Sequence, residues 1–510
     1  MSFGYFDWIE HYGRRCGQKI AIEDLASKRE LSFAELARRT NSLGRFLIEE
    51  IRAAHGDRVC LLAKSCPEAF ELQFACAKAG TIFVPLNWRL ALQELQYIVS
   101  DAEPLCLFYE PEFSDVATAL LAGGSIRGIR LGSESSDDYE AKIVRHKGGV
   151  LTRPTMDMEE TWSILYTSGT TGNPKGVMLS YRMVTANTFN FSIPTRISTD
   201  SKFLCAMPTF HTGGLNVYAN PVLHSGGTVV IMRDFDPALA LAQMSSTDVG
   251  ITHFFGTPSH YIFMSELPEF DEATFPTLVN AGMGGAPPSA SLIERWLSKK
   301  IPLQPTYGMT EIGPGILTTE LERVSEKIGT AGTPSLHMEF KVADPATGRE
   351  CDPREVGEIW VRGPAVMSGY WRQADTTAKS FHDGWFKSGD AAYRDEEGFV
   401  FIVDRLKEMF ISGGENVYPA EIEKVLSTLP EVSMVAVVGV PDARWGEVGR
   451  AFIVLKQGRA LTAQQAEATC RASLAKYKVP KLFTFVESLP QTSSGKVQRS
   501  ALKQRAAVPD

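Results

Sequence analysis

The sequence predicts an α/β protein with a large N-terminal part built on mixed sheets and a small C-terminal α+β part. An apolar run at 57–63, a helical stretch at 65–79 and a second apolar run at 81–85 are typical of parallel strands joined by a helix. A further run at 105–109 continues the alternation. The polar stretch 131–144 predicts a surface excursion or a subdomain boundary. From 433 onward the order is strand, strand, helix and tail, which indicates a separate small unit.

Composition bounds the class of protein. The chain has 510 residues, of which 44% are hydrophobic and 22% charged, so it is globular, and its length allows three or four domain-sized units. A net charge of −8 gives no reason to expect nucleic acid as a partner. The eight cysteines are scattered without a Cys-x-x-Cys pair, so a reducing cytoplasm is the simplest setting. We find no signal peptide and no apolar run long enough to enter a bilayer stably.

The most informative stretch is 166–176, Tyr-Thr-Ser-Gly-Thr-Thr-Gly-Asn-Pro-Lys-Gly. Its glycines let backbone amides approach a ligand closely, its hydroxyls are donors, and Lys175 adds a positive charge. This composition predicts a loop that wraps a polyphosphate. The loop is not a Walker motif, because Lys175 is followed by Gly176 and the later Lys496 by Val497. A nicotinamide-binding fold has no support either, since no Gly-x-Gly-x-x-Gly follows a strand.

A second group of chemically suited residues lies at 306–311, Thr-Tyr-Gly-Met-Thr-Glu. Tyr307 offers a flat face for a purine, Thr310 a hydroxyl for phosphate, and Glu311 a hard oxygen ligand for Mg²⁺. Asp390, at a loop tip, can accept hydrogen bonds from both ribose hydroxyls, although a capping role would also explain it. His211 alone is more often a structural residue than a catalytic one, and residues around Lys496 alone would be read as a surface turn.

These stretches, in this order, resemble the motifs of the adenylate-forming superfamily. That family holds acyl-CoA synthetases, adenylation domains of peptide synthetases and firefly-type luciferases. The resemblance spans nearly the whole chain and is greatest to bacterial acyl-CoA synthetases, the fatty-acid–CoA ligases. It implies an N-terminal AMP-binding domain at 1–404, a hinge at 405–407 and a mobile C-terminal domain at 408–510.

The resemblance also implies site residues. Catalytic roles fall to Lys496, Glu311, Thr310 and His211, and the metal site to Thr171 and Glu311. The residues implied to bind ATP and AMP are Thr167, Ser168, Gly169, Thr170, Thr171, Gly172, Lys175, Gly284, Gly285, Ala286, Tyr307, Gly308, Asp390 and Arg405. Lys407 matches the hinge position, and Gly413 and Gly414 match the loop that forms part of the pantetheine tunnel.

The expected acyl pocket combines the resemblance with side-chain size. Its predicted lining is His211, Gly213, Tyr218, Phe255, Gly282 and Met283. The glycines would leave room, the larger residues would give an apolar wall, and no charged residue there pairs with a second substrate charge. The first expectation is a medium- or long-chain fatty acid, and the second is an aryl or polycyclic acid.

The implied activity is an ATP-dependent ligase that needs Mg²⁺, converts a carboxylic acid to its adenylate and transfers the acyl group to CoA. CoA is favoured by the basic C-terminal tail and by the Ser-Gly-Gly-Glu-Asn loop at 412–416. An acyl-AMP ligase that loads a carrier protein is the alternative, and nothing favours a luciferase-like oxidation. A catalytically silent nucleotide-binding protein is disfavoured because the key charged residues are all present. A homodimer is compatible with the sequence, which does not decide the oligomeric state.

Overall fold

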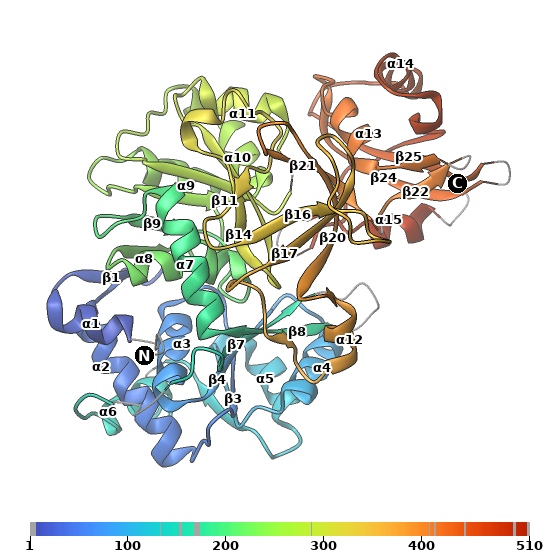
Figure 1. The fold of residues 1–510 in the computed structure, drawn as a ribbon. Helices are drawn as coiled ribbons and strands as arrows, with labels where there is room; N and C mark the ends of the chain where they lie inside the picture. The colour runs from blue at the N-terminus through green and yellow to red at the C-terminus, as the bar shows by residue number, and fades with distance from the viewer. Residues whose placement is uncertain are drawn as a thin grey trace.

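Two large sheets and two small ones carry the fold (Figure 1). The computed structural model describes residues 7–132, 134–151, 156–167, 174–286, 288–406, 408–412, 415–442, 445–492 and 496–506. Of these, Arg405, Glu415 and Asn416 are described by their backbone alone. The two large sheets are mixed and take most of their strands from the first part of the chain, and the two small sheets come mainly from the last part. The predicted α/β class with a small α+β C-terminal part is therefore confirmed.

The first large sheet anchors the predicted phosphate loop. Its seven strands lie in the order β18 (Gly369–Tyr370), β8 (Lys175–Ser180), β7 (Thr161–Thr167), β4 (Ile82–Leu86), β3 (Arg58–Leu62), β5 (Cys106–Tyr109) and β6 (Arg127–Arg130). The pairs from β7 through β6 are parallel, as the strand–helix alternation predicts, whereas β8 runs antiparallel to β7 and to β18. Because β7 and β8 are antiparallel, both ends of the loop lie at the same end of this strand pair.

The second large sheet carries the predicted acyl and adenine segments. Its nine strands lie in the order β15 (Thr333–Pro334), β14 (Gly313–Thr318), β13 (Leu303–Met309), β12 (Asn280–Gly284), β11 (His253–Gly256), β9 (Lys202–Cys205), β10 (Thr228–Ile231), β1 (Ile20–Asp24) and β2 (Arg29–Ser32). The strands from β13 to β1 are parallel neighbours. Ligands of such sheets bind beyond the carboxyl ends of the strands.

Helices fill the space between the two large sheets and cover their outer faces. One core cluster takes residues from both sheets and from α1 (Trp8–Arg15), α2 (Phe33–Arg45), α3 (Pro67–Ala79), α7 (Tyr181–Thr195) and α8 (Ala219–His224). The outer face of the first sheet packs on α4 (Leu92–Ala102) and α5 (Ser114–Leu121), and that of the second on α9 (Pro237–Ser245), α10 (Pro258–Ser265) and α11 (Ala290–Leu297). None of the helices in the described ranges is long and apolar enough to cross a bilayer.

Two small sheets complete the chain. The third sheet contains β16 (Glu339–Ala343), β17 (Gly357–Arg362), β19 (Phe381–His382), β20 (Trp385–Arg394) and β21 (Val400–Arg405), and α12 (Ala374–Lys379) precedes β19. The fourth contains β22 (Phe410–Ser412), β23 (Glu415–Val417), β24 (Val432–Asp442), β25 (Gly446–Leu455) and β26 (Leu482–Phe485), with α13 (Pro419–Leu426), α14 (Ala463–Ser473) and α15 (Arg499–Ala506). The helix α13 lies near β21 (Figure 1), and the Ala420 amide of the former donates to Asp404 Oδ2 of the latter at 3.0 Å.

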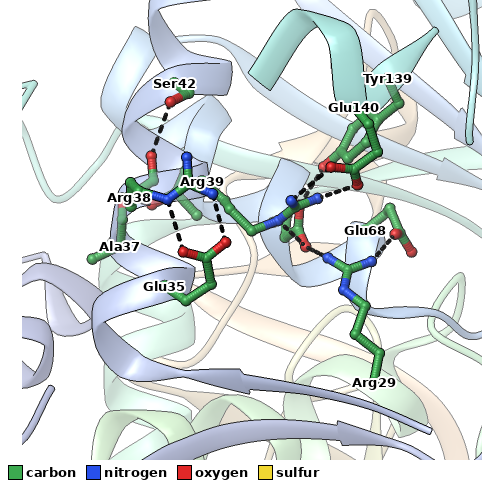
Figure 2. Close-up of polar contacts among 11 residues, drawn as sticks. Arg29, Glu35, Ala37, Arg38, Arg39, Ser42, Glu68, Tyr139 and Glu140 are labelled. Atoms are coloured by element: carbon green, nitrogen blue, oxygen red, sulfur yellow. Dashed lines mark hydrogen bonds and ion pairs between the residues drawn. The ribbon is translucent and has the colours of Figure 1, made fainter. Parts of the chain in front are cut away.

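The polar stretch 131–144, which predicts a surface excursion or a subdomain boundary, is exposed at residues 134–137. It then leads into α6 (Tyr139–Arg145), whose Tyr139 is 1% exposed. Its polar side chains are partners of buried charges. Arg39 on α2 binds Glu140 with two hydrogen bonds of 2.6 and 2.9 Å and Glu71 at 2.9 Å, and Arg29 also reaches Glu71 (Figure 2).

We predict that Arg39→Ala lowers the free energy of unfolding by about 3–5 kcal/mol, because it leaves Glu71, which is fully buried, without one of its two cations. The neighbouring Arg38→Ala is the matched control. Arg38 pairs with Glu35 at the surface, where the two side chains are 34% and 37% exposed. Its loss should cost less than about 1 kcal/mol. Equal shifts of the two variants in urea denaturation would contradict the importance of the buried network.

Candidate active site

The two residues that flank the phosphate loop are neighbours across the β7–β8 pair. Thr167, the last residue of β7, pairs with Lys175, the first residue of β8. The predicted loop residues Ser168, Gly169, Thr170, Thr171 and Gly172 lie outside the described residues, as do Lys407, Gly413 and Gly414. The strands thus set where the loop leaves and re-enters the sheet.

Lys175 and Glu311 come together around a residue that our sequence reasoning missed. Tyr370, on the edge strand β18, donates its hydroxyl to Glu311 Oε1 at 3.1 Å. Lys175 Nζ lies 5.3 Å from the centroid of the Tyr370 ring, within the range of a cation–π contact. Burial and the charge of Glu311 raise the pKa of Tyr370, so the hydroxyl remains a donor. The sequence signal was slight, namely a tyrosine between Gly369 and Trp371.

Tyr307 and Asp390 also meet, although 83 positions separate them in the sequence. The Tyr307 hydroxyl donates to Asp390 Oδ2 at 2.5 Å, and Asp390 is 5% exposed. On the neighbouring strand β21, Arg405 stands opposite Asp390 in register. Thr310 is buried beside Glu311, and Gly308 lies so close to the backbone of Gly313 and Pro314 that any side chain would collide there. The three segments predicted to bind the nucleotide, which are 306–311 and the strands that carry Asp390 and Arg405, therefore come together.

Lys496, from the small C-terminal unit, lies near the end of β12. Gly285 follows β12 with a φ of +85°, a conformation that favours glycine. A Cβ built there would lie 3.5 Å from Lys496 Cε and 3.5 Å from Thr257 Cγ2, so Lys496 touches the carboxyl end of β12. Two hydrogen bonds, at 2.6 and 3.1 Å, join Lys496 to Thr492. Ala286 follows in the same loop and is exposed, whereas Gly284 packs on Thr306 and Phe255.

His211 is neutral at physiological pH. Burial, with a smaller contribution from the charge of Lys496, lowers the pKa of His211 to about 4. Its Nδ1 accepts a hydrogen bond from the Gly213 amide at 3.0 Å, so the ring proton resides on Nε2. His211 can therefore donate one hydrogen bond from Nε2 but supplies no positive charge. His211 lies two residues before a π-helical turn at Gly213–Val217, a local geometry common at functional sites.

The predicted acyl lining is divided by the pleat of β11 and β12. Phe255 contacts the positions where Cβ atoms of Gly282 and Gly284 would be, at 2.9 and 3.0 Å. Met283 lies on the opposite face, buried in the outer core with Phe254, because successive residues of a strand point to opposite sides. Contrary to our expectation, Met283 does not share a face with Phe255.

The room expected beside the glycines is largely occupied by protein. A Cβ at Gly282 would collide with Oη of Tyr218, and one at Gly214 with the carbonyl of Pro208. At Gly213 it would meet Met207 Cε at 3.0 Å and His211 Nδ1 at 3.2 Å. The space beside these glycines is therefore filled by neighbouring side chains and backbone of the protein.

Two family models match the chain. The model described as "AMP-binding enzyme" matches residues 9–371, and the one described as "AMP-binding enzyme C-terminal domain" matches residues 421–496.

The chain belongs to the AMP-binding enzyme family.

Its relatives include acid–CoA ligases, which it matches over nearly their whole length. This AMP-binding enzyme is 40% identical to a feruloyl-CoA synthase of an Amycolatopsis species over 93% of the chain and 94% of the relative. It is 35% identical to the indoleacetate–CoA ligase of Aromatoleum aromaticum over 98% of both. The ATP-bound MatB structure from Rhodopseudomonas palustris matches with a TM-score of 0.91 at 31% identity and 98% coverage of both chains. The enzyme is thus an AMP-forming acid–thiol ligase that uses ATP, Mg²⁺ and CoA.

The residues present suit Mg²⁺ held mainly by a nucleotide. The described residues hold no group of three or more Asp, Glu, His or Cys side chains that could form an all-protein metal site. Glu311 is a buried carboxylate that accepts a hydrogen bond from Tyr370, whose ring also faces Lys175. One such carboxylate, together with a lysine predicted to bind phosphate, fits Mg²⁺, which binds through one or two carboxylates plus substrate phosphates. The metal would neutralise charge on the β- and γ-phosphate oxygens.

We predict that Tyr370→Phe lowers kcat/KM for ATP in pyrophosphate exchange about tenfold or more, because a hydrogen bond to the charged Glu311 is lost. The ring over Lys175 remains, so Tyr370→Leu should be more damaging. Tyr393→Phe, on β20 and stacked on Phe401, serves as the matched control and should leave the rate unchanged. Unaltered kinetics in Tyr370→Phe would show that Glu311 needs no such support.

We also predict that the pH profile of adenylation lacks an ionisation of His211 near 6.5. A pKa lowered to about 4 means that His211 binds fewer protons folded than unfolded between about pH 4 and 6.5. Its contribution to stability is therefore present above about pH 6.5 and declines as the pH falls toward 4. The test is the pyrophosphate-exchange rate of wild type and His211→Asn between pH 5 and 8. An ionisation near 6.5 that disappears in the variant would contradict a neutral His211.

Proposed function

We propose that this enzyme joins a hydrophobic aryl acid to CoA. The observation that carries the proposal is the similarity to feruloyl-CoA synthase at 40% identity over 93% of the chain. Relatives named for indoleacetate and 2-succinylbenzoate also act on acids that contain an aromatic ring. The fatty acid, which the sequence alone favoured, is the weaker choice. Aromatic side chains beside the β12 glycines are compatible with a flat, apolar acyl group.

The reaction proceeds through two half-reactions. A carboxylate oxygen attacks the α-phosphate of ATP and forms a bond to it as the bond to pyrophosphate breaks, which yields acyl-AMP and pyrophosphate. The sulfur of CoA then attacks the acyl carbon, its thiol proton is released, and AMP leaves. Activation is needed because oxide is a poor leaving group from a carboxylate, whereas AMP is a good one.

Positioning and charge neutralisation are the tasks of the protein in the first half-reaction. Lys496 would bridge the acid carboxylate and the α-phosphate, which its place beside Gly285 supports. His211 would donate from Nε2 to the acid or phosphate oxygens, as its tautomer permits. Lys175 and Glu311, joined through Tyr370, would hold the pyrophosphate end and its metal ion. Tyr307 and Asp390 would hold the adenosine, with Arg405 on the adjacent strand.

The second half-reaction requires Lys496 to leave so that the thiol can approach. We propose that the unit from 408 onward turns about Lys407 and brings Gly413 and Gly414 toward the acyl-AMP. The close approach of Lys496 to Gly285 corresponds to the adenylating arrangement in this scheme. A relative named fatty acid–[acyl-carrier-protein] ligase, 35% identical over 94% of the chain, keeps a carrier-protein thiol as the alternative acceptor.

The decisive experiment is a panel of acids with ATP, Mg²⁺ and CoA, read by mass spectrometry. We expect the highest kcat/KM with arylpropenoic or arylacetic acids and much lower values with dodecanoic and hexadecanoic acids. A preference for fatty acids would overturn the aryl assignment. Adenylate without any acyl-CoA, together with acylation of a phosphopantetheinyl carrier protein, would replace CoA as the acceptor.

Lys496→Ala serves as the internal control of the same assay. Loss of one preorganised charge donor should reduce adenylation by about 10²–10³-fold while ATP binding persists. Lys481→Ala, an exposed lysine of the same basic tail, should behave as wild type. Equal activity of the two variants would remove the proposed role of Lys496.

A further inference from the structure

The turn that carries Asp390 is a bulge in strand β20. Between Glu358 and Trp360 the strand β17 advances by two residues, whereas its partner β20 advances by four, from Ala391 to Lys387. A bulge interrupts the ladder of hydrogen bonds, bends the strand and turns a side chain in a new direction. Residues 388–390 lie in this bulge, and Asp390 among them would hold the ribose in the proposed function.

The side chain of Glu358 acts as a hydrogen-bond partner for the bulged backbone. Its Oε1 accepts a hydrogen bond from the Gly389 amide at 2.9 Å, and its Oε2 accepts one from Trp360 Nε1 at 2.8 Å. Both Glu358 and Trp360 are buried, at 6% and 2% exposed. A carboxylate only accepts hydrogen bonds, so two N–H donors match its two oxygens. Trp360 therefore fixes the carboxylate that holds the amide of Gly389.

Gly389 is constrained on its other side as well. Its φ of +74° favours glycine, and no described atom lies within 4 Å of the place where a Cβ would be, so glycine serves the backbone conformation and not the packing. Its carbonyl accepts a hydrogen bond from the Leu406 amide at 2.9 Å. Leu406 directly precedes Lys407, about which the small unit is proposed to turn. The backbone of Gly389 is thus held by Glu358 on one side and by the end of β21 on the other.

The position of Asp390 depends on this backbone. Its amide donates to Ser388 Oγ at 3.0 Å within the bulge, and its Oδ2 accepts from the Tyr307 hydroxyl at 2.5 Å. A shift of Gly389 would move the next residue, and with it the carboxylate that Tyr307 contacts. A displacement of about 1 Å at a substrate contact can cost on the order of 100-fold in rate.

We propose that Glu358 is a positioning residue for the nucleotide. It holds the Gly389 amide inside the bulge and is itself held by Trp360, and so sets the direction in which Asp390 meets the ribose hydroxyls. It acts through the backbone of Gly389 and not by contact with a substrate. The inference rests on the proposed function, since it takes Asp390 as the ribose partner, and it deepens that function by naming the residue that orients this partner.

The test compares ATP with analogues that lack one ribose hydroxyl. We would measure kcat/KM for ATP, 2′-deoxy-ATP and 3′-deoxy-ATP by pyrophosphate release, for wild type, Glu358→Gln and Asp390→Asn, with the acid that wild type uses best. Glu358→Gln should lower the preference for ATP over at least one deoxy analogue about tenfold or more, the scale of one hydrogen bond to a charged group. A merely structural role would lower all three values equally, and an unchanged preference would overturn the inference.

Replacement of Trp360 gives a second test. Glutamine has one accepting oxygen and an NH2 group that donates, so in Glu358→Gln one of the two N–H groups faces another donor. Trp360→Phe keeps a ring but removes the indole donor, and alone it should lower the preference for ATP about threefold. Because the conflict between donors is then absent, the double variant should show a preference closer to wild type than Glu358→Gln does. Losses that simply multiply in the double variant would contradict the proposal.

Glu339→Gln is the matched control. Glu339 lies on β16 in the same sheet and pairs with Arg362, with its own side chain 59% exposed. Its preference for ATP should equal that of wild type, and a loss as large as that of Glu358→Gln would overturn the inference. If Glu358→Gln fails to fold, Trp360→Phe decides, because an unaltered preference in that variant would also overturn it.

Asp390→Asn separates failure of the inference from failure of the proposed function. An unchanged preference for ATP in Asp390→Asn would reject Asp390 as the ribose partner, and with it that part of the proposed function. A loss in Asp390→Asn without any loss in Glu358→Gln would reject the positioning role alone. Losses in both variants, with Glu339→Gln unaffected, would support the proposal.

Discussion

The contact between Lys496 and the end of β12 is the interaction on which the rest of the site depends. It joins a side chain of the small unit to a loop of the large one, and places a positive charge where strands of a parallel sheet end. A site between two units can be completed when they close and dismantled when they separate. Burial, with a smaller contribution from the same charge, lowers the pKa of His211 to about 4, so the imidazole is neutral at physiological pH.

A second constraint lies where Tyr370 contacts both Lys175 and Glu311. Lys175, Tyr370 and Glu311 come from three separate strands or loops, and each contact involves the tyrosine. The hydroxyl supports the carboxylate while the ring faces the ammonium group, so a single side chain orients both charges. Because β18 is an edge strand that pairs with β8 in the first sheet, movement at that edge would change the positions of Lys175 and Glu311 together.

Much of this architecture follows from local sequence signals. Ser32 caps α2 through the Glu35 amide, Pro419 opens α13, and Thr462 and Gln465 form a capping box on α14, because these signals act within one helical turn. The strands of the first sheet followed from their apolar alternation with helices. The packing of α6 could not be predicted from the polar stretch 131–144, because Glu140 pairs with the buried Arg39, which is distant in the sequence.

By itself, the sequence determined the fold class, the AMP-forming ligase family and the chemical types of the site residues, since these depend on short motifs and local periodicity. Only the tertiary structure decided which residues meet: Tyr370 with Glu311, Tyr307 with Asp390, and Tyr218 with Gly282. It also decided that Met283 faces the outer core and Phe255 does not. The physical reason is that strand register and packing join positions far apart in the chain, and a one-residue change along a strand reverses the face that a side chain occupies.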